Sequence, residues 1–400
     1  MSEVANIPQL RFPGFSDEWE ERPLKDVSTF FNGKAYKQAE LLSSGKYPVL
    51  RVGNFFTNNS WYYSNLELDE NKYCDNGDLL YAWSASFGPR IWAGEKVIYH
   101  YHIWKVINHS QVTKKFLFIV LDNETAKMKA QSANGFALLH ITKGTIENWK
   151  INLPTRQEQQ KIAAFLTAVD SKIEQLSKKK ALLGEYKKGL MQQIFSQAIR
   201  CKADDGSDFP DWEEKKLGDV CKLQGGYAFK SAEFQKHGIP IIRISNISNN
   251  NDFIDNRNLV YYNEIKNSDK FIIKNGDLIV AMSGATTGKS SIYNLIEDAY
   301  LNQRVGLFKA NNSLLDYGFL IQIVFSYIFA TQLDSVLVAG AQPNVSSKDI
   351  EGFEISLPSK IEQNKIANFL SSIDSKIEQV GKQLDESKQF KKALLQQMFV

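Results

Sequence analysis

The sequence predicts an α+β protein, a tandem pseudo-symmetric repeat of two mixed α/β domains, each followed by a long helix, with the two helices packing as an antiparallel coiled coil. Three observations predict it. The chain repeats itself after about 200 residues, each copy begins with short apolar stretches separated by Gly and Asn, and each copy ends with apolar residues at 4-3 spacing. We place the first domain at 1–152, the first long helix at 153–200, the second domain at 201–356 and the second long helix at 357–400.

The composition indicates a folded chain without a membrane segment. Of 400 residues, 43% are hydrophobic and 23% charged, close to globular averages, and the net charge is only +3, so any nucleic-acid site must be local. The cysteines, Cys74, Cys201 and Cys221, form no CxxC, which argues against a disulfide framework or a zinc knuckle and fits a reducing cytoplasm. The apolar stretch 319–330 is too short to span a bilayer, and the first residues show no signal-peptide pattern. We therefore expect a cytoplasmic protein with no membrane attachment.

The two globular copies match in order along the chain. Trp19 aligns with Trp212, and the following segments keep nearly the same spacing. The paired segments are 15–27 with 209–220, 47–54 with 239–246, and 76–90 with 275–289. Expected strands are PVLRV, DLLYAW and IWKVI in the first copy, and PIIRI, FIIKNGDLIVAM and RVGLFK in the second. Each domain also has a stretch expected to be helical, 114–123 or 314–333.

The helical parts of the repeat are far more alike than the globular parts. INLPTRQEQQKIAAFLTAVDSKIEQ (151–175) lies over ISLPSKIEQNKIANFLSSIDSKIEQ (355–379) at a constant offset of 204 positions. We interpret the alike helices as contacting something shared, and the diverged domains as recognising two different things. The alternative is that globular loops simply drift faster.

Both helical segments carry a coiled-coil seam. At 1.5 Å per residue, each would make a rod of roughly 60 Å. The residues predicted to pair the helices are Ile162, Leu166, Val169, Ile173, Leu176, Leu183, Leu190 and Ile194 with Ile366, Leu370, Ile373, Ile377, Val380, Leu384, Leu394 and Met398. The same seam positions also contain Lys180, Lys187, Ser387 and Lys391. Either the pairing loosens there, another protein covers that end, or the lysines reach water at a wet edge.

Three motifs resemble catalytic or metal sites without satisfying their patterns. SGATTGKS (283–290) has three residues between its glycines where a phosphate-binding loop needs four, although a basic glycine loop could still meet a DNA phosphate through Lys289 and backbone N–H groups. Glu264-Ile265-Lys266 with Asp255 gives only a weak nuclease pattern. His100, His102 and His109 lack a nearby carboxylate or Cys, so packing or DNA contact is favoured over metal binding. We expect no catalytic residue and no metal site.

Taken together, the sequence resembles the specificity subunit of type I restriction-modification systems. The resemblance covers nearly the whole chain and rests on LPTRQEQQKIAAFL, GDLIVAMSGATTGK, YLNQRVGLF, AQPNVSS and LPSKIEQNKIANFL, and on their order along the chain. It implies two target recognition domains, each reading one half of a bipartite, asymmetric double-stranded DNA site. The helices would set the spacing and dock two methyltransferase subunits, and the full complex would add two restriction subunits. It implies no cofactor in this chain, with S-adenosylmethionine, ATP and Mg in the partners.

The resemblance and the loop chemistry together give candidate DNA-binding residues. In the first domain they are Lys34, Tyr36, Lys37, Arg51, Asn54, Trp83, Ser84, Ser86, Arg90 and His102. In the second they are Tyr227, Lys230, Arg243, Asn246, Ser283, Thr286, Thr287, Lys289, Gln303, Arg304, Gln342 and Asn344. Arg51 and Arg243 occupy equivalent positions and could instead be structural. The first copy departs from the family pattern at YHYHIWKV (99–106), where the second has YLNQRVGL.

Two other functions remain as alternatives. One is a non-DNA scaffold that bridges partners through its coiled-coil rods, which the modest net charge permits. The other is a stand-alone nuclease or methylase, against which the missing methylase signature and the weak nuclease pattern argue. A two-headed reader with a fixed spacer should require half-sites about one DNA turn apart, near 34 Å.

Overall fold

The computed structural model describes residues 6–56, 58–84, 86–132, 141–247, 252–265, 269–339 and 344–400. Residue contacts divide the chain into two compact units, Met1–Ser177 with Lys382–Val400, and Lys178–Gly381. The units do not end at the predicted domain boundaries, because each includes part of both long helices. Apolar residues of the helices belong to the same buried clusters as residues of the domains.

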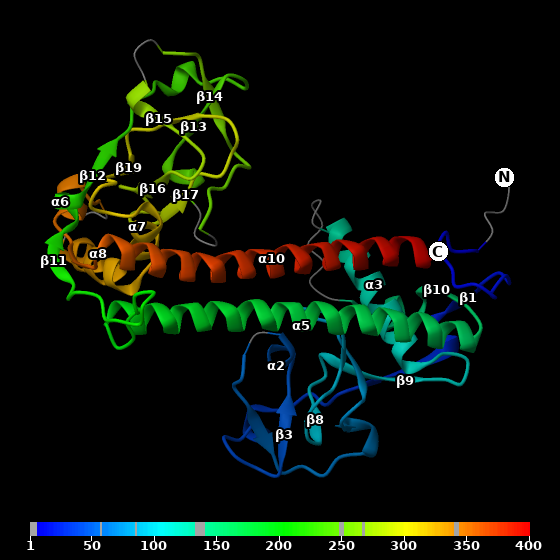
Figure 1. Cartoon of the computed structure of the whole chain (residues 1–400). Helices are drawn as coiled ribbons and strands as arrows, with labels where there is room; N and C mark the ends of the chain where they lie inside the picture. Colours follow the sequence, from blue (N-terminus) through cyan, green and yellow to red (C-terminus); the bar gives the residue numbers. More distant parts are fainter. Residues whose placement is uncertain are drawn as a thin grey trace. The chain divides into compact units, whose positions relative to one another are not determined.

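The first domain contains short strands and helices that lead into a long helix (Figure 1). Its elements are β1 (Glu20–Pro23), α1 (Leu24–Val27), β2 (Ser28–Asn32), η1 (Gln38–Glu40), β3 (Tyr47–Leu50), α2 (Val52–Phe56), β4 (Tyr62–Ser64), η2 (Glu70–Lys72), β5 (Tyr73–Cys74), β6 (Leu79–Ala82), β7 (Gly88–Ile91), β8 (Val97–Tyr99), β9 (Ile103–Asn108), α3 (Lys114–Ser132), α4 (Lys143–Glu147), β10 (Lys150–Leu153) and α5 (Arg156–Phe195).

The second domain has a similar series of elements (Figure 1). They are β11 (Glu213–Lys216), α6 (Leu217–Val220), β12 (Cys221–Gly225), η3 (Ser231–Glu233), β13 (Ile239–Ile242), η4 (Ile244–Asn246), β14 (Val260–Tyr262), η5 (Asp269–Phe271), β15 (Ile272–Ile273), β16 (Leu278–Ala281), β17 (Ser290–Ile292), β18 (Ala299–Leu301), β19 (Val305–Ala310), α7 (Tyr317–Val324), α8 (Tyr327–Ala339), α9 (Ser347–Glu351), β20 (Glu354–Leu357) and α10 (Lys360–Met398).

The sheets of the two domains have the same topology, as the internal repeat predicts. In the first domain an antiparallel sheet has the order β2-β9-β6-β7, and a second sheet, β4-β3-β8-β5, contains one parallel pair, β3 with β8. In the second domain the corresponding orders are β12-β19-β16-β17 and β14-β13-β18-β15, with β13 parallel to β18. A two-stranded pair, β1 with β10 or β11 with β20, precedes each long helix. The α+β tandem fold is confirmed.

The stretch 314–333, expected to be helical, forms two helices rather than one. Asp316 caps α7 by accepting a hydrogen bond from the Phe319 amide, and the helix ends at Val324, with Phe325 as its C-cap. The Ser326 hydroxyl then donates to the Ile323 carbonyl at 2.6 Å, which satisfies the end of α7, and α8 departs at 54°. Among the described residues no single helix is long and apolar enough to cross a membrane, and only this bent pair passes such a test jointly.

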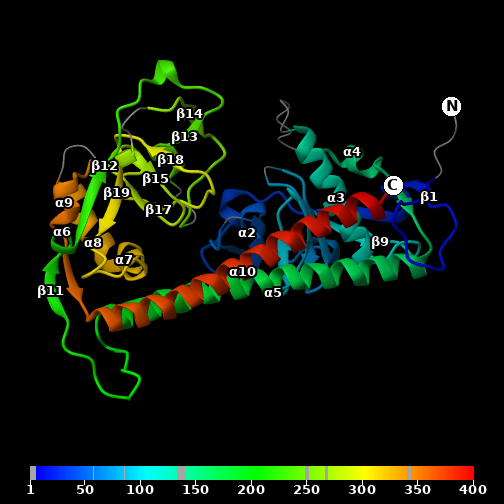
Figure 2. The ribbon, with the colours of Figure 1, turned by 45° about the horizontal axis from the view of Figure 1, so that its top comes forward.

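Within each unit the two long helices run antiparallel (Figures 1 and 2). In the first unit, Leu166 near the start of α5 shares a buried cluster with Leu394 and Met398 near the end of α10. In the second unit, Ile194 at the end of α5 clusters with Ile366 near the start of α10. All sixteen residues predicted to pair the helices are buried or half-buried, and the predicted antiparallel packing is confirmed.

Two of the seam lysines form ion pairs between the helices. Lys187 on α5 lies 2.6 Å from Asp374 on α10, and Lys391 on α10 lies 2.6 Å from Asp170 on α5. Lys187 and Lys391 are 204 positions apart, as are Asp170 and Asp374, so the two ion pairs are the same contact made once in each copy of the repeat. The Lys180 side chain is exposed and lies against Gly381, and Ser387 bonds back to its own helix at Gln383. The seam therefore stays paired at Lys187 and Lys391.

The repeated Glu-Gln dipeptide fixes the start of each long helix to its domain. Gln159 accepts from the Thr113 amide at 2.9 Å and donates to the carbonyls of Gln111 and Pro154. Gln363 makes the corresponding three bonds, to the Asp316 amide and to the carbonyls of Leu314 and Pro358. Gln159 and Gln363 are each 1% exposed, and their side chains supply hydrogen-bond partners to backbone groups of the loop before α3 or α7.

The neighbouring glutamates are also buried and satisfied. Glu158 accepts two bonds from the Arg11 guanidinium, at 2.7 and 2.8 Å. Glu362 accepts from Arg200 at 2.9 Å and from the Trp212 indole at 3.1 Å. A fully buried carboxylate is tolerated only when it is paired and hydrogen-bonded. Both copies of the repeat therefore keep this Glu-Gln dipeptide because the two side chains are needed for contacts within the chain.

Candidate nucleic-acid interface

In the first domain, four loops meet at one end of the sheets. They follow β2, β3 and β6, and the fourth is the turn His100–His102 between β8 and β9. The His100 amide donates to the Leu50 carbonyl at 2.9 Å, and the Tyr101 amide to the Lys34 carbonyl at 3.0 Å. The His102 carbonyl accepts from the Trp83 amide at 3.0 Å. We call this surface the first rim, formed by 33–37, 51–54, 83–84, 86 and 100–102.

The second domain builds the same surface from equivalent loops. The Asn302 amide donates to the Ile242 carbonyl at 3.0 Å, and the Gln303 amide to the Tyr227 carbonyl at 2.8 Å. The Arg304 carbonyl accepts from the Met282 amide at 2.9 Å. Thr286 adds a side-chain bond to the Ile244 carbonyl at 3.0 Å. We call this surface the second rim, formed by 226–230, 243–246, 282–287, 302–304 and Asn344.

Most of the predicted DNA-binding residues lie on these two rims. In the first domain these are Lys34, Tyr36, Lys37, Arg51, Asn54, Trp83, Ser84, Ser86 and His102. In the second they are Tyr227, Lys230, Arg243, Asn246, Ser283, Thr286, Thr287, Gln303, Arg304 and Asn344, the last bridged to Ser283. Gln342 lies outside the described residues. Arg90 and Lys289 lie on or next to strands that line side grooves. As DNA contacts, all of these residues stay predictions.

Arg51 and Asn54 are bonded within their own loop. The Asn54 side chain accepts from the Arg51 amide at 3.1 Å, and both side chains donate to the Ser60 carbonyl. The Arg51 guanidinium also lies over the Tyr62 ring, at 4.3 Å from its centroid. These bonds brace the loop, which supports a structural role for both residues.

The equivalent residues of the second domain are used in the same way. The Asn246 side chain accepts from the Arg243 amide at 3.0 Å and donates to the Asp255 carbonyl at 3.1 Å. Arg243 donates to the Asn258 carbonyl at 3.1 Å. Asn246 is 1% exposed. Both domains therefore contain the Arg-Asn pair because its hydrogen bonds hold the loop after β3 or β13 in place.

Aromatic rings crowd the turn of the first rim. Tyr36 stacks on His100 with the rings 18° apart, Trp83 packs edge-on against His102, and Tyr101 is 38% exposed. Burial, and then the charges of His102 and Arg51, lower the pKa of His100 to about 4. Burial also lowers the pKa of His102. Because both imidazoles are neutral at pH 7, each offers one donor and one acceptor.

The turn of the second rim is polar and cationic instead. Gln303 and Arg304 are exposed, and neither side chain has a partner among the described residues. Lys230 is also exposed and forms an ion pair with Glu233 at 3.3 Å. Amide and guanidinium groups can each make two parallel hydrogen bonds to a purine edge. The two rims thus share a backbone and differ in the chemistry they present.

The glycine loop 283–289 is closed on itself. The amides of Thr287, Gly288 and Lys289 donate to carbonyls of Gly284, Ala281 and Thr286, at 3.1, 2.7 and 2.9 Å. Gly284 and Gly288 have φ of +82° and +79°, so the turn needs glycine at both places. Three of the amides that could bind a phosphate are therefore already used, while the Lys289 side chain is exposed.

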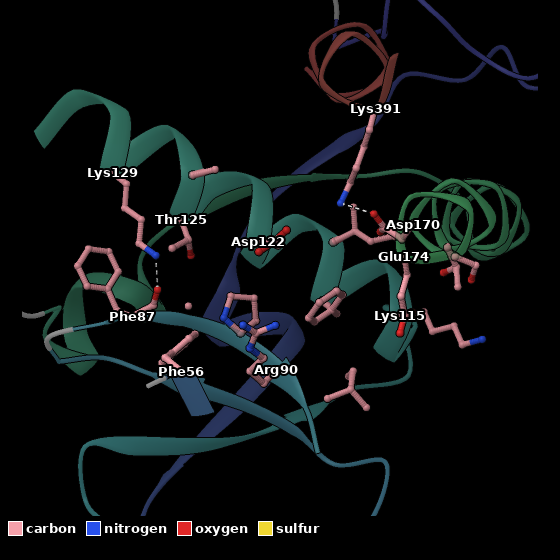
Figure 3. A pocket seen from close by; sticks show the side chains of 18 residues that line it. Phe56, Phe87, Arg90, Lys115, Asp122, Thr125, Lys129, Asp170, Glu174 and Lys391 are labelled. Carbon is pink, nitrogen blue, oxygen red and sulfur yellow. Dashed lines mark hydrogen bonds and ion pairs between the residues drawn. The ribbon is translucent and has the colours of Figure 1, made fainter. Parts of the chain in front are cut away.

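Arg90 and Lys289, equivalent in the repeat, each line a groove beside a helix. The first groove, about 680 Å³, lies between β7, α3 and the start of α5, with Lys391 of α10 at its edge (Figure 3). Lys391 reaches Asp170 and Lys129 reaches the Phe87 carbonyl across it. The second groove, about 470 Å³, lies beside α8 and contains Asp252 and Asp334. Both grooves contain acidic as well as basic side chains, whereas a surface that binds only phosphates would be mainly basic.

The residues considered for metal or nuclease chemistry form no metal-binding group among those that the structure describes. Within the described part of the chain, no three His, Cys, Asp or Glu residues form a group that could hold a metal. His109 bonds to the Thr29 hydroxyl and the Asp26 carbonyl, away from the other two histidines. Asp255 is ion-paired with Arg257, and Lys266 lies outside the described residues.

The sequence analysis missed residues that the structure places at the centre of each rim. Tyr101 and Asn302 belong to the two turns, yet neither was among the predicted contacts, and His100 was considered only for packing or DNA contact and left out of the candidate list. Gly33 and Gly226 lie against these turns, where a Cβ atom would stand 2.3 and 2.2 Å from the nearest carbonyl oxygen. The difference between YHYH and YLNQ in matched segments was the signal that could have identified the turns.

Comparisons with known proteins agree with the repeat and the fold. A family model, the type I restriction modification DNA specificity domain, matches residues 16–184 and again 210–386. The type I restriction enzyme MjaVIII specificity subunit of Methanocaldococcus jannaschii is 27% identical over 402 residues, covering 96% of this chain and 92% of that protein. The EcoBI specificity subunit of Escherichia coli is 18% identical over 392 residues, covering 93% and 82%. The crystal structure of the type I restriction-modification system S subunit from M. genitalium has the same fold, with a TM-score of 0.65 at 16% identity over 98% of this chain and 99% of that one.

Proposed function

This chain belongs to the type I restriction-modification DNA specificity family, and from that premise we propose that it reads a bipartite, asymmetric site on double-stranded DNA. Each rim reads one half-site, and α5 and α10 set the gap between the halves. The helices also dock two methyltransferase subunits, to which two restriction subunits are added in the full complex, in the cytoplasm. Adenine methylation and DNA cleavage are carried out by these partners, which bind S-adenosylmethionine, ATP and Mg.

One observation carries this proposal: two rims with the same backbone present different side chains. A protein that repeats one rim unchanged would read the same sequence twice. Here the turn of the first rim presents Tyr101 and His102, and that of the second presents Gln303 and Arg304. Since base edges in the major groove differ in their donors, acceptors and methyl groups, different side chains select different bases. An asymmetric site follows.

The helices have the properties that a fixed spacer requires. α5 is continuous from Arg156 to Phe195 and α10 from Lys360 to Met398. The buried Glu-Gln pair fixes the start of each helix to its domain, and the ion pairs Lys187–Asp374 and Lys391–Asp170 fix the helices to each other. A spacer held at both ends keeps a constant length.

Repeated exposed side chains on the helices support the docking of two copies of one partner. Tyr186 on α5 and Phe390 on α10 are 204 positions apart in the sequence, and they are 57% and 52% exposed. Large exposed aromatic side chains are typical anchors of protein interfaces. The same anchor presented twice suits two identical methyltransferase subunits.

The test is to co-express the chain with a type I methyltransferase subunit from the same genome and to map methylated adenines by long-read sequencing. We expect a split motif with two different halves and a fixed gap. A stable complex that methylates no defined motif would contradict the proposal and favour a scaffold that bridges partners without reading DNA.

A further inference from the structure

The turns between β8 and β9 and between β18 and β19 are held in place by the same backbone bonds. In both, the first amide of the turn donates to the last carbonyl of β3 or β13, and the second donates to a carbonyl of the loop after β2 or β12. The last carbonyl of the turn accepts from the loop after β6 or β16. The turn also closes on itself, with the Ile103 amide donating to the His100 carbonyl and the Val305 amide to the Asn302 carbonyl, both at 2.9 Å. The backbone position of each turn is therefore set mainly by bonds between backbone groups. The turn's own side chains add one long bond in each case, at 3.5 Å, in which His100 or Asn302 accepts from the amide two residues further on.

Glycine makes this close packing possible. Gly33 and Gly226 lie directly against the turn, and any Cβ there would stand within 2.4 Å of two carbonyl oxygens. Real Cβ atoms do not approach oxygen so closely, so these positions accept only glycine while the turn stays where it is. The repeat keeps this glycine although the turns themselves share no residue between His100–His102 and Asn302–Arg304.

The side chains of the turns are correspondingly free to differ. Tyr101 and Gln303 occupy equivalent places and both are exposed, as is Arg304. His102 is half-buried against Trp83, with ring centroids 4.9 Å apart. A rigid backbone that carries exchangeable, outward side chains positions a contact without fixing its identity.

We propose that each turn is the base-reading element of its rim, with Arg304 bonding a guanine edge and Gln303 an adjacent adenine edge in the major groove of one half-site, and Tyr101 and His102 reading the other half-site. The assignment rests on the proposed function. Arg bonds the O6 and N7 of guanine, and Gln the N6 and N7 of adenine, each in a bidentate manner. Tyr101 offers an apolar ring for a thymine methyl group beside the donor and acceptor of a neutral imidazole.

The test exchanges the turns within the complete complex with methyltransferase subunits. The triple variant N302H/Q303Y/R304H gives the second rim the turn of the first. We expect the half-site read by the second domain to change, while the other half-site and the gap stay the same. Lys274→Ala is the matched control, because this exposed lysine lies before β16, at the opposite end of the strand from the rim.

Single variants keep the inference testable if the triple variant does not fold. Arg304→Ala should relax one base position of that half-site, with discrimination falling about 10- to 100-fold. An unchanged motif in Arg304→Ala and Gln303→Ala would overturn the inference. A uniform loss of methylation on all sequences would also overturn it, because it would assign Arg304 to a phosphate. If the unmodified complex has no motif, the proposed function itself fails.

Discussion

Replacing Gln159 by Leu should detach the start of α5 from the first domain. The change keeps the size of the side chain and removes three hydrogen bonds, one buried and two partly buried. The Thr113 amide and the Gln111 and Pro154 carbonyls then lose their side-chain partner. A buried backbone group left unpaired costs about 1–3 kcal/mol. Even the lower end of that range for three groups gives a loss of about 3 kcal/mol, which is a large share of the stability of a domain.

Hydrogen exchange resolves this effect, because a chain with two compact units need not unfold in one step. The amides of the first turns of α5 exchange when this part of the helix opens. In Gln159→Leu the free energy of that opening should be about 3 kcal/mol lower than in the unmodified chain. Gln160→Leu is the control: this neighbouring side chain is exposed, so its effect should stay within about 0.5 kcal/mol. Gln363→Leu should reproduce the loss in the second unit. Equal protection in Gln159→Leu and Gln160→Leu would refute the structural explanation of the repeated dipeptide.

Three further predictions concern the rims and the seam. Gly226→Ala should lower the free energy of unfolding of its unit by about 1–3 kcal/mol. Gly225→Ala should not, because a Cβ atom added there meets nothing within 4 Å. Equal melting temperatures of the two variants would contradict the close packing at Gly226. Because burial first, and neighbouring charges next, lower the pKa of His100 to about 4, below its unfolded value of about 6.5, the first unit should lose on the order of 1 kcal/mol as pH falls between these values; an unchanged pH profile in His100→Gln would disprove this. A double-mutant cycle on Lys187 and Asp374 should give a coupling of about 1 kcal/mol that weakens with salt, and a coupling of zero would show that the contact adds no stability.

The fold could be predicted because its signals are local or repeated. The 4-3 spacing of residues such as Leu166 and Leu370 depends only on helical geometry, and both are fully buried. The break in the stretch 314–333 was not predicted, because Ile323 and Val324 continue the apolar pattern up to it. What ends α7 there is a side-chain bond from Ser326 to the backbone, which hydrophobic periodicity does not reveal.

The candidate site was harder to predict, since a residue that matches between the two copies can be kept either for a common function or for the structure of its loop. Arg51 and Arg243 match in the repeat, as residues with a common function would, yet the structure bonds both to their own loops. Tyr101 and Gln303 do not match in the repeat, and only Gln303 was among the predicted DNA contacts. Where two copies share a rigid backbone, it is the mismatched positions that are free to recognise different partners. That distinction needs the three-dimensional contacts of the turn.

The dependence of methylation on the gap between half-sites tests the central claim most directly. Duplexes would carry both mapped half-sites with the gap changed one base pair at a time, and methylation by the complete complex would be measured on each. Each added base pair shifts one half-site by about 3.4 Å and turns it by about 35° around the axis. A spacer of constant length predicts efficient methylation at one gap and a steep loss one base pair to either side. Equal methylation across several gaps would contradict two rims held at a fixed separation.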